Sequence, residues 1–288
     1  MPEQLHSLDP IITIDDLSSK RRLRDLPWWL FAIVLIAIYV FIIISSNENY
    51  NKAFDFIKSG LIITITTTLK AFLIALFFGL LSGLGRISKN VVINNLARFY
   101  VEIIRGIPIL VLIFFIALVG VPVLVDGLNN IGFWLADNGL QLLGKVFTAV
   151  TNQDISMNTR AIIALAVTYG AYLAEIFRAG IQSIVKGQME AARSLGMSYG
   201  QSMRYVILPQ AIRNVLPALG NDFVAMVKDS SLVSVLAVRD ITQVSRLYAG
   251  STFRYRESYV TLAVLYLTMT VVLSLVVQLV ERRLKTHE

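Results

Sequence analysis

Hydrophobic residues gather into six long runs along the chain, with polar segments between them. Three runs contain no charged residue over about the length of a membrane span, and they cover 26–47, 106–125 and 258–280. Three others carry a few polar or charged residues, and they cover 61–85, 161–177 and 214–238. Apolar runs of this length predict transmembrane helices, so the pattern predicts an all-α polytopic membrane protein.

The composition agrees with a bilayer environment. Hydrophobic residues make up 56% of the chain and charged residues 16%, with a mean hydropathy of +0.66, whereas a soluble domain has about 25% charged residues. The chain has no cysteine, and its two histidines, His6 and His287, lie near its ends. Thiolate, zinc and Ser-His-Asp chemistry are therefore disfavoured, so we predict no enzyme, no catalytic residue and no metal site. We expect membrane lipid as a partner and no nucleic acid.

The distribution of basic residues predicts the orientation of the spans. Six spans place both termini on the same side, and assigning that side to the cytoplasm puts twice as many lysines and arginines inside as outside. This bias follows the positive-inside rule. The segment 239–258 runs against the bias, since it carries Arg239, Arg246, Arg254 and Arg256. We expect this segment to fold against the protein or a partner.

A polar segment interrupts the apolar pattern near the middle of the chain. Residues 189–210 read MEAARSLGMSYGQSMRYVILPQ and combine helix-forming residues with Gly196 and Pro209. This order predicts a helix, a glycine turn and a second helix, and Pro209 limits the helix before it. Two short helices in a cytoplasmic loop present a surface, which indicates that another protein docks there. Close to the end of span four, Glu175 and Arg178 predict an ion pair that supports this loop.

The segment Glu190-Ala191-Ala192 with Gly196, followed by Val206-Ile207-Leu208-Pro209, resembles the EAA loop of permease subunits of ATP-binding-cassette (ABC) importers. Further segments resemble the branch that imports polar amino acids, the histidine, glutamine and glutamate permeases; they are 99–110, 172–198, 208–221 and 228–235. The resemblance implies the type I ABC importer permease fold, a five-helix core, with one extra N-terminal transmembrane helix.

The resemblance also implies an organisation of the chain. The expected segments are a cytoplasmic tail at 1–27, the extra transmembrane helix at 28–46, the permease domain at 57–284, the EAA loop at about 182–212 and an outer insert at about 126–159. Apolar residues of the insert recur at near-helical spacing. Two interpretations of the insert stay open: it lies on the outer membrane face, or it forms part of a platform for a solute-binding protein.

The EAA loop of the family docks in a cleft of a cytoplasmic ATPase. When the roles of the family's residues are transferred to this chain, the coupling residues are Glu190, Ala191, Ala192 and Gly196. Leu208 and Pro209 are then the residues at which the support of the loop ends. The implied partners are a dimer of ABC ATPases, which binds ATP and Mg, a second permease subunit (identical or paralogous) and an extracytoplasmic solute-binding protein. The implied location is the bacterial inner membrane. A near-match to a phosphate-binding loop at 139–145 fails, because Val146 replaces the required Ser or Thr.

Polar residues inside two predicted spans are candidates for contact with an amino acid substrate. Ionisable groups in a membrane are functional candidates, and the candidates are Lys70, Asn221, Lys228, Asp229 and Ser231. Asn221 and Lys228 are seven residues apart and therefore share a helix face. The alternative is structural: Lys70 reaches the interface or pairs across the bundle, and Lys228 and Asp229 form structural ion pairs.

Small residues and helix breakers in the same spans carry further predictions. Pro217 and Gly220 predict an interruption of the fifth span, and the spacing of Gly79 and Gly83 predicts a close helix contact. We expect a polar amino acid cargo of the glutamate, glutamine or aspartate type, or a broad polar range. The rival is an ion-coupled secondary amino acid transporter, which requires an inverted repeat with two interrupted helices.

Overall fold

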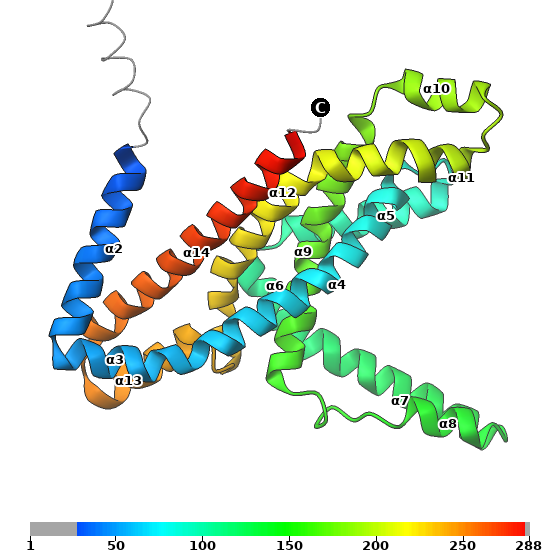
Figure 1. The fold of residues 1–288 in the computed structure, drawn as a ribbon. Helices are drawn as coiled ribbons and strands as arrows, with labels where there is room; N and C mark the ends of the chain where they lie inside the picture. Colours follow the sequence, from blue (N-terminus) through cyan, green and yellow to red (C-terminus); the bar gives the residue numbers. More distant parts are fainter. Residues whose placement is uncertain (1–27, 286–288) are drawn as a thin grey trace, which may run out of the picture. The chain divides into compact units, whose positions relative to one another are not determined.

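The computed structural model describes residues 28–285, and within that range it contains helices and turns but no strand (Figure 1). The tail predicted at 1–27 and both histidines lie outside the described residues. The described chain divides after Glu48 into two units. The first contains α2 (Trp28–Ser46), a helix of 19 residues, which is close to the about 20 residues that cross a bilayer.

The second unit begins at Asn49 and contains the other helices. In chain order these are α3 (Glu48–Ile57), α4 (Leu61–Ile87), α5 (Val91–Gly106), α6 (Ile109–Phe115), α7 (Val121–Asp137), α8 (Gln141–Phe147), α9 (Met157–Gln182), α10 (Lys186–Ser194), α11 (Tyr199–Ser202), α12 (Leu208–Asp229), α13 (Ile241–Thr252) and α14 (Tyr255–Lys285). Between them lie the 3₁₀ turns Lys58–Gly60 and Ser230–Leu236 and the π-helical turns Ile116–Gly120 and Met203–Ile207.

Four helical runs among the described residues are long and apolar enough to cross a membrane. They are Glu48–Ile87, Ile109–Asp137, Met157–Gln182 and Tyr255–Arg283. Each is longer than the apolar run that predicted it. Two predicted spans are not among them: the first, 26–47, which contains α2, and the fifth, 214–238. The residues of the fifth belong to α12 and the following 3₁₀ turn, and α12 carries Arg213, Asp222, Lys228 and Asp229.

The core of the second unit is the contact between α4 and α9 (Figure 1). A Cβ atom at Gly79 of α4 would lie 2.6 Å from the Cβ of Leu173, and one at Gly83 would lie 2.9 Å from the carbonyl oxygen of Ala174. These distances leave no room for a side chain, so the two glycines let the helices approach backbone to backbone. The close contact predicted from the glycine spacing is confirmed.

The two π-helical turns each precede a proline. The turn Ile116–Gly120 lies before Pro122, and the turn Met203–Ile207 lies before Pro209. A proline has no N–H, and its ring clashes with the carbonyl of the residue four positions earlier. In both places that residue lies within the π turn. The wider turn accommodates the ring, so the helix continues past the proline.

The path of α12 corrects one prediction. The helix runs unbroken through Pro217 and Gly220, which were expected to interrupt it. Gly220 instead serves packing, because a Cβ there would lie 2.7 Å from Cγ1 of Val277 on α14. Leu208 and Pro209, which were expected to end the support of the coupling loop, form the first turn of α12, which follows directly from the π turn.

The arginine-rich segment 239–258 folds against the protein as α13. Ile241 and Tyr248 of this helix are buried together with residues of α3 and α14. The segment is also tied by Arg254, whose guanidinium donates to the side-chain oxygen of Asn49. Asp240 caps the helix by accepting from the backbone N–H of Gln243 at 2.8 Å. Asp240 is fully buried, and this burial raises the pKa of its carboxyl group from 3.8 to about 6.

The buried cap makes the stability of the fold depend on pH. The raised pKa means that the folded state holds the Asp240 proton more tightly than the unfolded state does. We expect the stabilisation to be complete below pH about 4 and lost as the pH rises through about 6, an effect of about 2 to 3 kcal/mol. Thermal unfolding of the detergent-solubilised protein across this range measures it. Asp240→Asn keeps a capping oxygen but has no proton to lose, so parallel pH profiles of the two proteins would contradict the prediction.

Candidate functional site

The segment that joins α9 to α12 has the predicted arrangement of helix, glycine turn and helix. α10 ends at Ser194, and Gly196 has a φ of +84°, which favours glycine. Ser198 and Gln201 then form a capping box at the start of α11: the Gln201 N–H donates to Oγ of Ser198 at 3.2 Å, and the Ser198 N–H donates to Oε1 of Gln201 at 2.8 Å. The glycine and the capping box fix the turn between the two short helices.

One side of this segment is anchored and the other is exposed. Ala192 of α10 is only 4% exposed, whereas Glu190, Ala191 and Gly196 are exposed. The segment rests on an apolar cluster whose buried members are Ile181, Ile207 and Ala211, with Leu84, Ile87, Ile184, Met189, Met203, Val206 and Leu208 packed against them. The coupling residues carried over from the family therefore form a surface that is supported from below and open to a partner.

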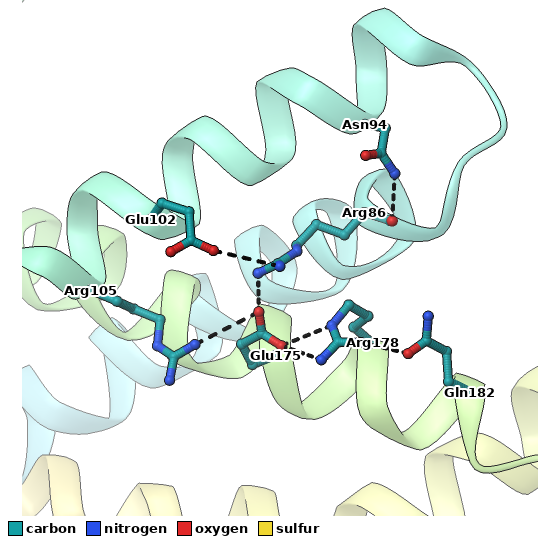
Figure 2. A network of polar contacts seen from close by, with 7 residues as sticks. All are labelled: Arg86, Asn94, Glu102, Arg105, Glu175, Arg178 and Gln182. Carbon is teal, nitrogen blue, oxygen red and sulfur yellow. Dashed lines mark hydrogen bonds and ion pairs between the residues drawn. The ribbon is translucent and has the colours of Figure 1, made fainter.

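Glu175 of α9 is the centre of a charged network that joins α4, α5 and α9 (Figure 2). The network lies near the segment between α9 and α12, which we call the coupling segment. Its Oε1 contacts the guanidinium of Arg86 from α4 and lies 3.7 Å from Nη1 of Arg105 from α5. Its Oε2 accepts from Nε and Nη2 of Arg178 at 2.8 Å. The side chains of Glu175 and Arg86 are 19% and 13% exposed, so this contact is largely removed from water.

The network extends at its edges to three further side chains, and one of them is Gln182, whose Oε1 accepts from Nη1 of Arg178 at 2.5 Å (Figure 2). Glu102 of α5 lies 3.7 Å from Nη2 of Arg86, but its side chain is 74% exposed. Asn94 donates from Nδ2 to the carbonyl oxygen of Arg86 at 2.6 Å and so joins the start of α5 to the end of α4. The sequence predicted only the pair Glu175–Arg178. Arg86 and Arg105 were missed, and the sequence feature that could have indicated them is their position in the last turns of α4 and α5.

The substrate candidates divide between two sides of α12 and its extension. Asn221 and Lys228 are exposed, as expected for residues on one helix face, and Asp229 is half-buried. Asp229 accepts a hydrogen bond from the hydroxyl of Tyr169 on α9 at 2.7 Å. Sequence reasoning missed Tyr169, which lies in an apolar run with no charged residue near it. The structure therefore joins α9 to the end of α12 through a buried tyrosine and a carboxylate.

The remaining two candidates lie on other elements. Ser231 is half-buried in the 3₁₀ turn after α12, and Lys70 is exposed on α4. Among residues 28–285, no hydrogen bond or ion pair joins Lys70 to Lys228, Asp229 or Ser231. The structure thus brings Asp229 together with Tyr169 but does not gather the five candidates into one bonded cluster, and their role in binding stays a prediction.

The chain belongs to the family of binding-protein-dependent transport system inner membrane components, whose model matches residues 75–286. A probable amino-acid permease protein, YxeN of Bacillus subtilis (strain 168), is 35% identical over 80% of this chain and 92% of its own length. The glutamine transport system permease protein GlnP of Escherichia coli (strain K12) is 36% identical over 73% and 84%. The arginine transport system permease protein ArtQ of Bacillus subtilis (strain 168) is 32% identical over 81% and 94%.

Solved structures agree with this membership. An amino acid ABC transporter crystallised with histidines has a TM-score of 0.64 and 38% identity, and the match covers 81% of this chain and 95% of that one. The inward-facing MetNI methionine ABC transporter has a TM-score of 0.54 at 19% identity and shows the fold alone. The resemblance to amino acid ABC permeases and the type I importer permease fold are confirmed. The match supports an importer subunit over an ion-coupled secondary transporter.

Removing the central carboxylate of the network tests its contribution to stability. Glu175→Ala leaves the largely buried guanidinium of Arg86 without its partner. We expect a loss of about 3 kcal/mol, because an unpaired buried charge keeps its desolvation penalty. The matched control is Glu102→Ala, whose exposed side chain contributes less than about 1 kcal/mol. Unfolding of the solubilised variants measures both changes, and equal losses would show that burial does not set the strength of this network.

Proposed function

We propose that this chain is the translocation subunit of an ATP-driven importer of polar amino acids, coupled to a separate ATPase through α10, Gly196 and α11. The observation that carries the proposal is the exposed EAA segment on its apolar support. Ala192 anchors the segment, and the exposed backbone turn at Gly196 lies beside it. A protein that docks here meets a rigid surface, so a movement of the partner reaches the helices underneath.

The proposed complex follows from what this chain contains and from its family. No stretch of residues 28–285 forms a phosphate-binding loop after a strand, since this range has no strand. A dimer of ABC ATPases would bind ATP and Mg, and its closure would move α10. A second permease, identical or paralogous, would complete the path, and a solute-binding protein would deliver cargo from outside. We place the complex in a bacterial inner membrane with both termini of this chain in the cytoplasm.

The proposed cargo rests on the named relatives and on the polar residues near the end of α12. Relatives at 32 to 36% identity are named for glutamine and arginine transport. An amino acid is a zwitterion, which requires a cation for its carboxylate and acceptors for its ammonium group. Lys228 would supply the cation, and Asp229, Ser231 and Asn221 would supply acceptors. A glutamate, glutamine or aspartate type of cargo, or a broad polar range, fits this set.

Changing the glycine turn tests the coupling role. Gly196 has a positive φ, so Gly196→Val strains the turn by about 1 to 2 kcal/mol, although a Cβ there meets no atom within 4 Å. We expect uptake driven by ATP to be lost while the protein still inserts in the membrane. The matched control is Gly200→Ala, which lies in the same segment, has no positive φ and also meets open space.

Uptake into proteoliposomes that contain the complete complex measures this effect, and copurification of the ATPase shows where the defect lies. We expect Gly196→Val to lose the ATPase or to keep it without ATP-driven uptake, and Gly200→Ala to behave like the unchanged protein. Normal uptake by Gly196→Val would contradict the coupling role of the turn.

A second variant tests the substrate candidates. Lys228→Ala removes an exposed cation from α12 without touching the hydrogen bond between Tyr169 and Asp229. We expect uptake to fall by about tenfold or more through loss of a charge-assisted contact, with assembly of the complex unchanged. Lys228→Arg keeps the charge and should retain part of the uptake. A complex that fails to assemble with Lys228→Ala would assign Lys228 a structural role instead.

A further inference from the structure

Helices α7 and α8 form a hairpin that projects away from α4, α9 and α12 (Figure 1). The turn between them uses Gly139, which has a φ of +86°. The helices touch at Gly132 and Gly144: a Cβ on Gly144 would lie 2.7 Å from the carbonyl oxygen of Gly132. The two backbones therefore meet at these glycines, with Ala136 and Phe147 beside the contact.

Polar and apolar side chains occupy different sides of α7. Asp126, Asn130 and Asp137 follow one another at intervals of four and seven residues, so they form one polar stripe along the helix. The exposed residues Leu124, Leu128 and Ile131 lie on the opposite side of the helix. Trp134, which is 64% exposed, lies four residues after Asn130 and therefore borders the stripe, as do the exposed residues Val123 and Phe133. One side of α7 is thus apolar, and the rest of the protein does not cover it.

The short helix α8 enlarges the same apolar surface. Leu142 and Val146 are four residues apart and are 83% and 70% exposed, and Leu143 beside them is exposed too. The polar residues Gln141 and Lys145 lie together on another side of the helix. We give the name hairpin face to six exposed apolar residues of the two helices: Leu124, Leu128, Ile131, Leu142, Leu143 and Val146.

The hairpin face continues the surface of a predicted membrane span. The run Ile109–Asp137 is 29 residues long, which corresponds to about 43 Å of helix, whereas the hydrocarbon core is about 30 Å thick. The last turns of α7 therefore reach the interface on the side opposite the coupling segment. Tryptophan is enriched at this depth because its ring is apolar and its N–H is polar, and Trp134 lies in these turns.

The loop after α8 fixes the orientation of α7 about its own axis. Arg160 at the start of α9 donates to the carbonyl oxygen of Ala117 at 3.1 Å and to that of Asn152 at 2.7 Å. Asn152 in turn donates from its side chain to Oδ1 of Asp126 at 2.7 Å. These bonds connect the polar stripe of α7 to the protein, so the hairpin face is turned outward.

We propose that the α7–α8 hairpin lies in the outer membrane interface, with the hairpin face against lipid acyl chains and the polar stripe of α7 toward water. The competing occupant, a solute-binding protein, belongs to the proposed function. Such a partner docks and leaves in each transport cycle, which would return Leu142, Val146 and Trp134 to water. An exposed apolar surface of this kind is costly in water but not in lipid, and its continuity with a membrane span favours lipid.

Tryptophan fluorescence in proteoliposomes tests the proposal. The chain has three tryptophans, Trp28, Trp29 and Trp134, so replacing all three by Phe and adding Leu128→Trp leaves a sole reporter on the hairpin face. We expect lipids brominated high on their acyl chains to quench its emission strongly, and aqueous iodide to quench it several-fold less than it quenches free tryptophan. The matched control carries Asn130→Trp in place of Leu128→Trp, which moves the reporter two residues along α7 to the polar stripe. For this control we expect the reverse pattern.

Two results would overturn the proposal. Strong iodide quenching of the Leu128→Trp reporter without quenching by brominated lipid would place the hairpin face in water, where a protein platform is the remaining occupant. Equal lipid quenching of the Leu128→Trp and Asn130→Trp reporters would show a hairpin immersed on all sides and not one lying in the interface. The measurement needs no ATPase, substrate or binding protein, so its outcome is separate from that of the uptake experiments.

Discussion

The backbone contact between α4 and α9 is the constraint on which the rest of the second unit depends. Gly83 meets Ala174, and Arg86 lies one helical turn beyond Gly83 on the same side of α4. The contact therefore delivers the Arg86 guanidinium to Glu175, the residue next to Ala174 (Figure 2). With larger side chains at Gly79 and Gly83 the helices would stand apart, and Glu175 would lose its contact with Arg86. Packing and electrostatics here are two consequences of one sequence feature.

The apolar cluster beneath the coupling segment explains how a movement of α10 reaches several helices. Met189 of α10 packs on Ile181 at the end of α9 and Ile207 in the π turn. α9 and α12 are in turn in close contact, because a Cβ on Gly180 would lie 2.0 Å from Cγ1 of Val215. A rigid contact transmits displacement, whereas the π turn is a place where the helix is already distorted. Displacement of α10 is thus expected to bend the chain at the π turn and not within α12.

The sequence predicted those features that depend on neighbouring residues. Four of the six apolar runs, the glycine turn at Gly196 and the close contact at Gly79 and Gly83 are all local signals, and the structure contains each of them. The effect of prolines was not predictable in this way. Pro209 and Pro217 read alike as helix breakers, yet a π turn carries the helix past the first and α12 continues through the second.

Contacts between residues that are far apart in the sequence could not be predicted, for a different reason. The partners of Glu175 lie on three helices. No residue next to Arg86 or Arg105 in the sequence indicates that these arginines contact Glu175. The same holds for Tyr169, which is 60 residues from Asp229. The burial of α13 was predicted only indirectly, because its arginines do not follow the charge bias of the other loops. This exception indicates that the segment folds against something, but it does not identify the helices that α13 contacts.

The charge balance around Glu175 has a physical explanation in the helix ends. Three guanidiniums face one largely buried carboxylate, and Glu102 is too exposed to balance the excess. Arg86 and Arg105 lie in the last turns of α4 and α5, however, where the carbonyl groups of the helix end carry partial negative charge. Their position at the helix ends therefore favours these two arginines in addition to Glu175. A single glutamate can join the three helices because the helix ends offset part of the repulsion among the arginines.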